Sequence, residues 1–148
     1  MKKYSSILLI IFMISSLLVF QHCSDSSDEP SDKEVTEEIL RSKSWSAASV
    51  NVPANTATEN DDWINFGVSF SETNMNTSGH PTGAEAVWPS GTYTVSEDGN
   101  SITREDGIIM SLSNISENGF STSFSVPEGT HIGGRIAALN GPYVFIME

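Results

Sequence analysis

Metal-binding and catalytic chemistry find little support in the residue types and spacings of this 148-residue sequence. His80 and His131 are far apart and form no His-x-x-His or His-Glu pair of the kind that holds zinc. We expect both to be surface histidines in loops. No serine stands in a Gly-x-Ser-x-Gly motif, and the sequence has no glycine-rich phosphate loop. The sequence therefore predicts a protein that is not an enzyme and holds no cofactor or metal.

One acidic segment places hard oxygen ligands close together. Glu59, Asp61 and Asp62 surround Asn60, whose amide oxygen would complete a set that suits calcium. The Asp-x-Asp-x-Asp-Gly spacing of a calcium loop is absent, and acids are frequent throughout the chain. We therefore favour a solvated acidic loop over a calcium site.

Aromatic side chains are the residues of this sequence best able to bind a ligand, because they combine a large apolar area with a polar handle. Trp88 lies beside Pro89 in a segment rich in loop residues, where burial is least assured. The alternative is that the rings pack on one another and fill the interior, and we expect this core role for Trp45. The aromatic ligand-binding residues that we predict are Trp88, Tyr93, Phe66, Phe70 and Phe124.

Arg104 and Arg135 are the only basic side chains after Lys43. Arg104 adjoins Glu105 and Asp106, so an exposed ion pair is the default expectation. An arginine inside a barrel would instead bind the carboxylate of a ligand through two hydrogen bonds. Both arginines are therefore further candidates for ligand binding.

The only cysteine, Cys23, stands at a sharp boundary in the sequence. The apolar segment 7–20 before it suits a signal peptide and is shorter than the about 20 residues of a membrane span. After Cys23 the chain turns acidic and rich in serine. We predict a signal peptide over 1–22, a flexible linker over 23–34 and lipid attachment at Cys23. The alternative is a free thiol, since one cysteine closes no intramolecular disulfide.

The charge of the chain excludes one class of partner. The net charge is −12, and removal of the first 22 residues takes away Lys2 and Lys3 but no acid, which leaves −14. Such a surface repels a phosphate backbone, so we expect no nucleic acid partner. It also repels anionic headgroups, which makes a covalent lipid anchor the more effective attachment to a membrane.

The rest of the chain alternates in a way that predicts strands after one short helix. The segment DKEVTEEILRSKSW, residues 32–45, has apolar residues at helical spacing, acids early and bases late. Strands are predicted where apolar and polar residues alternate. In the last strand Val144 and Ile146 make the second face apolar too, so we expect it in mid-sheet or under a cover. A short strand near Ala86 to Trp88 is a further expectation. The alternating segments are 64–70, 93–95, 108–112, 120–126 and 143–147.

Four Asx-Gly pairs stand between these segments: Asp98-Gly99, Asp106-Gly107, Asn118-Gly119 and Asn140-Gly141. Such pairs favour tight hairpins, because the primed turns need positive φ at both central residues. Hairpins leave no room for the crossover helices of a parallel sheet. The sequence thus predicts an all-β, antiparallel up-and-down meander, closed into an eight-stranded barrel so that its edges are hidden. We assign this domain to 35–148.

Several motifs of the domain look familiar in combination. Trp45, Asp62-Trp63, VWPSGTY (87–93), ITREDG (102–107) and GPYVF (141–145) together resemble the lipocalin-like lipoproteins of the Bacteroidetes group. CSDSSDE, residues 23–29, resembles the export signal of surface lipoproteins in that group. The resemblance implies a small calycin-type barrel, anchored in the outer membrane through Cys23 and exposed at the cell surface.

Two functions follow as hypotheses. The first is a non-enzymatic binding module, whose barrel holds a small apolar or amphipathic ligand. The second is a structural or interaction lipoprotein, whose interior is solid and which contacts other envelope proteins. An eight-stranded barrel is just wide enough for side chains to fill, so the size of the cavity separates the two.

Overall fold

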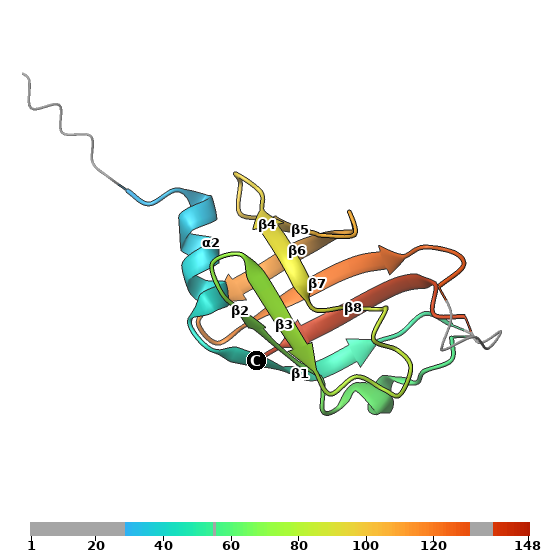
Figure 1. Ribbon diagram of the computed structural model, residues 1–148. Coiled ribbons are helices and arrows are strands. Elements are labelled where there is room, and N and C mark those ends of the chain that lie inside the picture. The colour runs from blue at the N-terminus through green and yellow to red at the C-terminus, as the bar shows by residue number, and fades with distance from the viewer. Residues whose placement is uncertain (1–28, 55, 131–137) are drawn as a thin grey trace, which may run out of the picture.

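The computed structural model describes residues 29–54, 56–130 and 138–148 (Figure 1). Eight antiparallel strands follow one another around a closed barrel in chain order, and β1 pairs with β8. The prediction of an all-β, up-and-down, eight-stranded barrel with a short N-terminal helix is confirmed. The strands are β1 (Ser44–Asn51), β2 (Gly67–Phe70), β3 (Asn74–Ser78), β4 (Gly91–Val95), β5 (Ser101–Arg104), β6 (Ile109–Ser116), β7 (Gly119–Val126) and β8 (Gly141–Met147).

The helix α2 (Asp32–Arg41) closes one end of the barrel, which we call the helix end (Figure 1). It begins at a capping box. The Ser31 hydroxyl accepts the N–H of Glu34 at 3.3 Å, and the Glu34 carboxylate accepts the N–H of Ser31 at 2.8 Å. These bonds to Ser31 lower the pKa of Glu34. Thr36 donates to the carbonyl of Gly99 at 3.1 Å, and Leu40 is fully buried, so the helix is docked on the barrel.

The opposite end, which we call the loop end, holds three long connections and one short one. They are 52–66, 79–90, 105–108 and the described parts of the β7–β8 connection, 127–130 and 138–140. The first contains a short 3-10 helix, η1 (Asn60–Trp63). The connections at the helix end are only 71–73, 96–100 and 117–118. The two ends are therefore closed by different means.

The hairpins at Asp98-Gly99 and Asp106-Gly107 form where predicted, but their turns differ from the prediction. A primed turn needs positive φ at both central residues, whereas only the glycine of each pair has one, +68° for Gly99 and +83° for Gly107. The N–H of each glycine donates to the carbonyl three residues earlier. Each loop is thus a β-turn that ends in a left-handed glycine, as in longer hairpins.

The other two Asx-Gly pairs stand at the starts of strands. Ser116 pairs with Gly119, so the two-residue connection is Glu117-Asn118 and Gly119 already belongs to β7. Gly141 begins β8 after the connection that leaves β7 at Val126. The prediction of a tight hairpin at Asn140-Gly141 is therefore wrong.

Some predicted strand boundaries also need correction. Ile64 follows η1 rather than opening a strand, its side chain is 75% exposed, and β2 begins only at Gly67. The 3-10 helix occupies the residues in which we expected the alternation to start. The segment from Ala86 to Trp88 forms turns, not a strand.

The last strand occupies mid-sheet, between β7 and β1, as predicted. Its second apolar face has no cover in the described part of the chain, because Val144 is 37% and Ile146 45% exposed. Within the described residues, no helix has both the length and the apolar character needed to cross a membrane.

Candidate functional site

The aromatic residues predicted to bind a ligand all point into the barrel, but they fall into two separate groups. Phe66, Trp88 and Phe124 meet at the loop end, with ring centres 5.2 Å apart for Phe66 and Trp88 and 5.6 Å for Trp88 and Phe124. Phe70 and Tyr93 meet at the helix end, 5.2 Å apart. The structure therefore brings the five residues into two clusters rather than one site.

The loop-end cluster comprises seven rings, from Trp63, Phe66, His80, Trp88, Phe124, Tyr143 and Phe145. Phe145 lies near its centre. It stacks on Phe124 at 5.8 Å and takes edge contacts from Trp63 and Trp88, both at 5.2 Å. Phe66 adds a further contact at 5.2 Å. Phe145 is fully buried, so these rings occupy the space in which a ligand would sit.

Polar atoms at the edge of this cluster are bound by the protein itself. Tyr143 donates its hydroxyl to the carbonyl of Leu139 at 2.9 Å, and burial raises the pKa of Tyr143. The Trp88 indole N–H donates to the sulfur of Met75 at 3.3 Å. His80 Nε2 lies 2.8 Å from the carbonyl oxygen of Trp88. His80, predicted to be a surface residue, is half-buried against the cluster.

Trp88 is therefore better buried than its loop position suggests. The sequence left its burial open, and its side chain is fully inaccessible to solvent. The connection 79–90 folds inward, so that Val87 and Trp88 are both buried without belonging to a strand.

The helix-end cluster comprises Trp45, Phe70, Tyr93 and Phe120. Trp45 packs edge-on against Phe120 at 5.2 Å, and its indole N–H donates to the carbonyl of Leu40, a buried residue of α2, at 2.8 Å. Tyr93 donates to the carbonyl of Ser71 at 2.6 Å, and burial raises its pKa. Trp45 fills the core and ties the helix to the barrel, as predicted.

One buried hydroxyl separates the two clusters. Thr122 lies on β7 between Phe120 and Phe124, opposite Leu112 on one side and Phe145 on the other. It is 1% exposed, and within the described residues its hydroxyl has no hydrogen-bond partner. An unpaired hydroxyl inside a protein is unfavourable by about 1–3 kcal/mol, so this position is a weak point of the packing.

Arg104 lies inside the barrel, and the default prediction of an exposed ion pair is wrong. It is 3% exposed, and Asp106 binds its guanidinium through both carboxylate oxygens, with Nε 3.2 Å from Oδ1. Nη1 donates to the carbonyl of Val87 at 2.7 Å, and the guanidinium carbon lies 5.5 Å from the centre of the Phe124 ring. A ligand carboxylate would therefore have to displace Asp106.

A small pocket lies beside Arg104, where strands β3 and β4 are paired over only a short length. The β3–β4 ladder contains only the pairs Asn74–Thr92 and Met75–Gly91. The pocket has a volume of about 180 Å³, and Met75 and Arg104 form its inner side. Pockets for drug-sized ligands measure about 300–1,000 Å³, so this one is too small for such a ligand.

Two side chains of the acidic segment accept hydrogen bonds from backbone N–H groups. Asp62 Oδ2 accepts the N–H of Glu59 at 2.8 Å, and Asn60 Oδ1 accepts the N–H of Val52 at 3.0 Å. In the part of the chain that the structure describes, no three His, Cys, Asp or Glu residues are grouped so as to hold a metal. These bonds give Asn60 and Asp62 a structural role within the β1–β2 connection.

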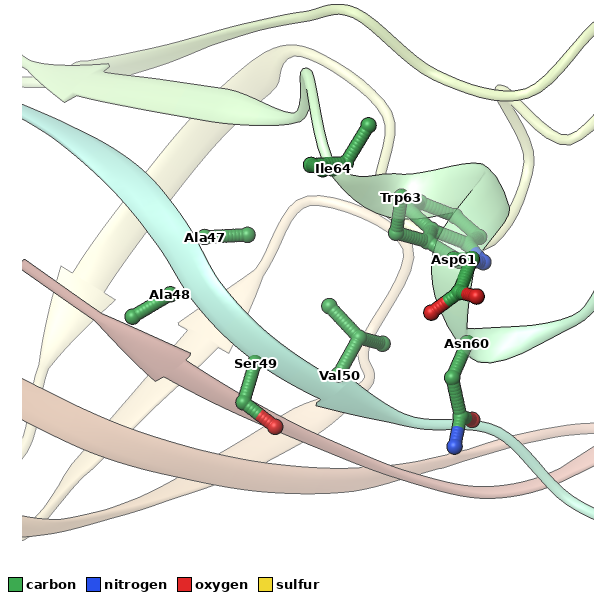
Figure 2. A pocket seen from close by; sticks show the side chains of 8 residues that line it. All are labelled: Ala47, Ala48, Ser49, Val50, Asn60, Asp61, Trp63 and Ile64. Carbon is green, nitrogen blue, oxygen red and sulfur yellow. The ribbon is translucent and has the colours of Figure 1, made fainter.

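A cleft on the outer surface lies between β1 and η1 (Figure 2). Its volume is about 260 Å³. Ala47 and Ala48 line the side formed by β1, while Asp61 and the exposed Ile64 line the side formed by η1 and the residue after it. Small side chains bound the cleft on the β1 side, and its one carboxylate is that of Asp61.

The outer wall of the barrel is free of charge. Of all residues in the eight described strands, only Arg104 is charged, and it points inward. Every acid of the described part lies in α2, in η1, in a connection or beside an end of the chain. The sequence carries a signal for this feature that our predictions did not use, because the alternating segments contain no acid.

Two regions of interest lie outside the described residues. Cys23, the predicted lipid-attachment residue, precedes them, and His131 and Arg135 fall in the gap between Thr130 and Ala138. Comparison of the chain with protein-family models and with curated proteins found no match. The resemblance to lipocalin-like lipoproteins and the predicted roles of these residues therefore stay predictions.

Proposed function

We propose that this protein is an exported, lipid-anchored interaction module of the bacterial cell envelope, and not an enzyme. Its barrel is a solid scaffold that presents an outer surface to a partner at the outer membrane. The packing of the loop-end cluster is the observation that supports this proposal most directly. Phe66, Trp88 and Phe124, three of the residues predicted to line a ligand site, are at most 5% exposed, and both phenylalanines pack against Trp88.

A carrier of apolar ligands fits this interior less well. A carrier needs a concave space among its apolar side chains, typically of about 300–1,000 Å³. The pocket that reaches Met75 and Arg104 measures about 180 Å³. Arg104 is already bound by Asp106 and by the carbonyl of Val87, so it has little to offer an incoming carboxylate.

Titration with fatty acids and apolar fluorescent probes separates the two functions. All three tryptophans are at most 1% exposed and two belong to the loop-end cluster, so a ligand in the interior would change their emission. We expect no saturable change in tryptophan emission and no saturable binding of the probes. Saturable binding at micromolar concentrations, abolished by Trp88→Ala in a variant that still folds, would replace our proposal with the carrier.

The lipid anchor is tested independently. The proposal of an anchor is supported by the basic start, the apolar segment 7–20 and the lone Cys23 followed by acids and serines. Metabolic labelling with a fatty-acid analogue in a bacterial host that processes lipoproteins should label the full-length chain and not Cys23→Ser. Equal labelling of the two chains would contradict acylation at this residue.

A further inference from the structure

The strand β1 has an open edge near the loop end of the barrel. Its pairing with β2 ends early, because the N–H of Ala47 donates to the carbonyl of Phe66 at 2.9 Å, but the N–H of Phe66 donates to the carbonyl of Trp63 instead. Beyond this point β1 continues to Asn51, and in the described part of the chain only β8 pairs with it. The last residues of β1 are therefore an edge strand on the side that faces η1.

Val50 presents both of its backbone polar groups at this edge. Ser46 and Glu148 exchange two hydrogen bonds, and alternate residues of each strand repeat this bonding between β1 and β8. The next residues of β1 that bond to β8 are Ser49 and Asn51, after an irregularity in the register. The N–H and the C=O of Val50, which lies between them, therefore point away from β8 and towards η1.

The two backbone groups of Val50 lack partners within the described residues. Val50 is only 6% exposed, and no described residue forms a hydrogen bond with its N–H or C=O on the η1 side. The N–H of Val52, the next one on this side, is already bound by the side chain of Asn60 at 3.0 Å. Buried backbone groups are almost always paired, so an unpaired donor and acceptor side by side indicate a place for a partner.

The cleft between β1 and η1 gives access to this edge (Figure 2). Val50 lines it on one side, and the carboxylate of Asp61 lies across from Val50 on the η1 side. Ile64, which also lines the cleft, is 75% exposed. The cleft thus combines a backbone donor, a backbone acceptor, one carboxylate and an apolar side chain.

The charge around the cleft is negative. Glu59, Asp61 and Asp62 lie in η1 or just before it, and all three are exposed. None of them forms an ion pair with a base of the described segments. Basic side chains of a partner are therefore attracted to the cleft, whereas an anion or a second copy of this chain, with its net charge of −12, is repelled.

We infer that this cleft binds an extended, basic segment of a partner protein, which adds a short strand to the open edge of β1. One residue of that segment accepts the N–H of Val50 and donates to its C=O, as opposite residues of antiparallel strands do. Lysine or arginine side chains of the neighbouring residues lie near Asp61. A polyamine would satisfy the carboxylate but not the N–H of Val50, whereas a peptide satisfies both. This inference rests on the proposed function, since it names the class of partner of the interaction module.

The edge predicts a weak and salt-sensitive contact. Val50 offers one pair of hydrogen bonds, because the N–H groups of Ala47 and Val52 are bound within the chain. The attraction to Asp61 acts at an exposed site, where salt screens it. We therefore expect an interaction that depends on both the backbone pairing and the charge, and that is lost when either is removed.

Fluorescence anisotropy of a labelled peptide measures this binding to the full-length chain in detergent. The probe is the peptide KVKVKVK, blocked at both ends, whose lysines and valines lie on opposite sides of a strand. The residue opposite Val50 points its side chain to the same, inward side, so we expect it to be a valine. Binding should be saturable and should weaken as salt is added. No binding of this probe would overturn the inference.

Two matched probes separate backbone pairing from charge. EVEVEVE keeps the alternation and reverses the charge, and it should not bind. KVKVKVK with N-methyl groups on all three valines keeps the charge but removes the N–H that would donate to Val50. This probe should bind at least about 10-fold more weakly, because the Val50 carbonyl is then left unpaired. Equal binding of the methylated and unmethylated peptides would show attraction by charge alone and would overturn the added strand.

Matched substitutions place the site on the chain. Asp61→Lys should weaken the binding of KVKVKVK at least about 10-fold, because like charges then meet at the cleft. Glu85→Lys makes the same change at an exposed acid of the loop end that does not line the cleft, and it should change the affinity by less than about 2-fold. In NMR spectra the amide of Val50 should shift on addition of the peptide, and its hydrogen exchange should slow. Equal effects of the two substitutions, or an unmoved Val50 amide, would contradict this site.

The cleft and the proposed function fail separately. Saturable binding of fatty acids with a change in tryptophan emission would overturn the interaction module, even if the peptide also bound at the cleft. Absence of peptide binding, with no saturable binding of fatty acids, would overturn the cleft alone.

Discussion

The two ends of the barrel are closed by different kinds of residue. At the helix end the strands are joined by short hairpins, and α2 covers the opening with Leu40 over Trp45. At the loop end the strands are joined by longer connections, and side chains of those connections, such as Trp63 and Trp88, fold into the barrel. An α-helix closes the first end, whereas connections between strands, one of which contains η1, close the second.

The difference extends to the indole N–H groups of the tryptophans. At the helix end both Trp45 and Tyr93 donate to backbone carbonyls, at 2.8 and 2.6 Å. At the loop end Trp63 donates to the hydroxyl of Thr58 at 3.3 Å, and Trp88 donates to the sulfur of Met75 at the same distance. The tryptophans of the two ends thus differ in their acceptors, whereas the tyrosines do not, since Tyr143 at the loop end also donates to a backbone carbonyl. Substitutions should reveal this contrast.

The largest effect is expected from removing a central ring of the loop end. Phe66→Ala should lower the free energy of unfolding by about 4–5 kcal/mol, the upper part of the range for buried phenylalanine. Phe66 is 1% exposed and contacts four other rings. Phe70→Ala at the helix end should cost about 3 kcal/mol, because Phe70 is 7% exposed and contacts two rings. Urea unfolding curves measure both.

The control for this comparison is Ile64→Ala. Ile64 is 75% exposed and lies two residues before Phe66, so its truncation should change stability by less than about 0.5 kcal/mol. A cost for Phe66→Ala as small as that for Ile64→Ala would mean that the loop end is loosely packed. That outcome would restore the case for a ligand cavity.

Two glycines of similar backbone conformation, one at each end of the barrel, extend the comparison between the two ends. Gly99 and Gly107 both have positive φ in hairpin loops, +68° and +83°, so alanine is strained at either by about 1–2 kcal/mol. At Gly99 a Cβ would also lie 2.6 Å from the Thr36 hydroxyl and 2.7 Å from the carbonyl oxygen of Asp32, both in α2. A Cβ at Gly107 would have no atom within 4 Å apart from those of its chain neighbours. Gly99→Ala should therefore cost more, because it also pushes the helix away.

Thermal melts of the two alanine variants, with helix content followed by circular dichroism, check this expectation. Gly107→Ala should melt as a single transition with unchanged helix content. Gly99→Ala should lose helical signal together with stability. Equal melting temperatures and equal helix content would show that α2 contributes nothing to the closure of its end.

The sequence predicts the helix end better than the loop end, and the reason is periodicity. Phe70, Tyr93 and Phe120 lie in strands whose alternation is regular, so their inward direction follows from the pattern. At the loop end Trp63 ends a short 3-10 helix and Trp88 lies in a turn segment, where strand alternation says nothing about direction. The inward-folded connection 79–90 accepts a hydrogen bond from Arg104 at Val87, a contact between segments that no local pattern contains.

For the candidate site too, the sequence predicted the direction of side chains on strands but not the contacts between them. The sequence placed Phe66, Phe70 and Phe124 on inward faces, and all three are inward. Whether rings on different strands meet or leave a space depends on register and on the loops that cover the end. Sequence alone therefore left the choice between a cavity and a solid interior open. The packing of Phe66 against Trp88 and Phe145 is the information that the structure adds.

A substitution at the boundary between the two clusters should stabilise the protein. Thr122 has a buried hydroxyl without a partner among the described residues, and valine has nearly the same shape and suits a strand. Thr122→Val should raise the free energy of unfolding by about 1 kcal/mol, because it removes a polar group whose burial is not compensated. A loss of stability, measured by urea unfolding, would indicate that the hydroxyl binds a water molecule that links the two ends.

The smallest effect compares the hydrogen bonds of two fully enclosed tryptophans. Trp45→Phe and Trp88→Phe remove similar ring volume, so the packing cost should be similar and the difference between them should report on the indole N–H. Trp45 donates to the backbone carbonyl of Leu40, which loses a partner inside the protein, whereas Trp88 donates only to a sulfur, a weak acceptor. We expect Trp45→Phe to cost about 1 kcal/mol more than Trp88→Phe in urea unfolding. Equal costs would mean that the link between α2 and the barrel is apolar only, and the contrast between the two ends would then lie in their packing alone.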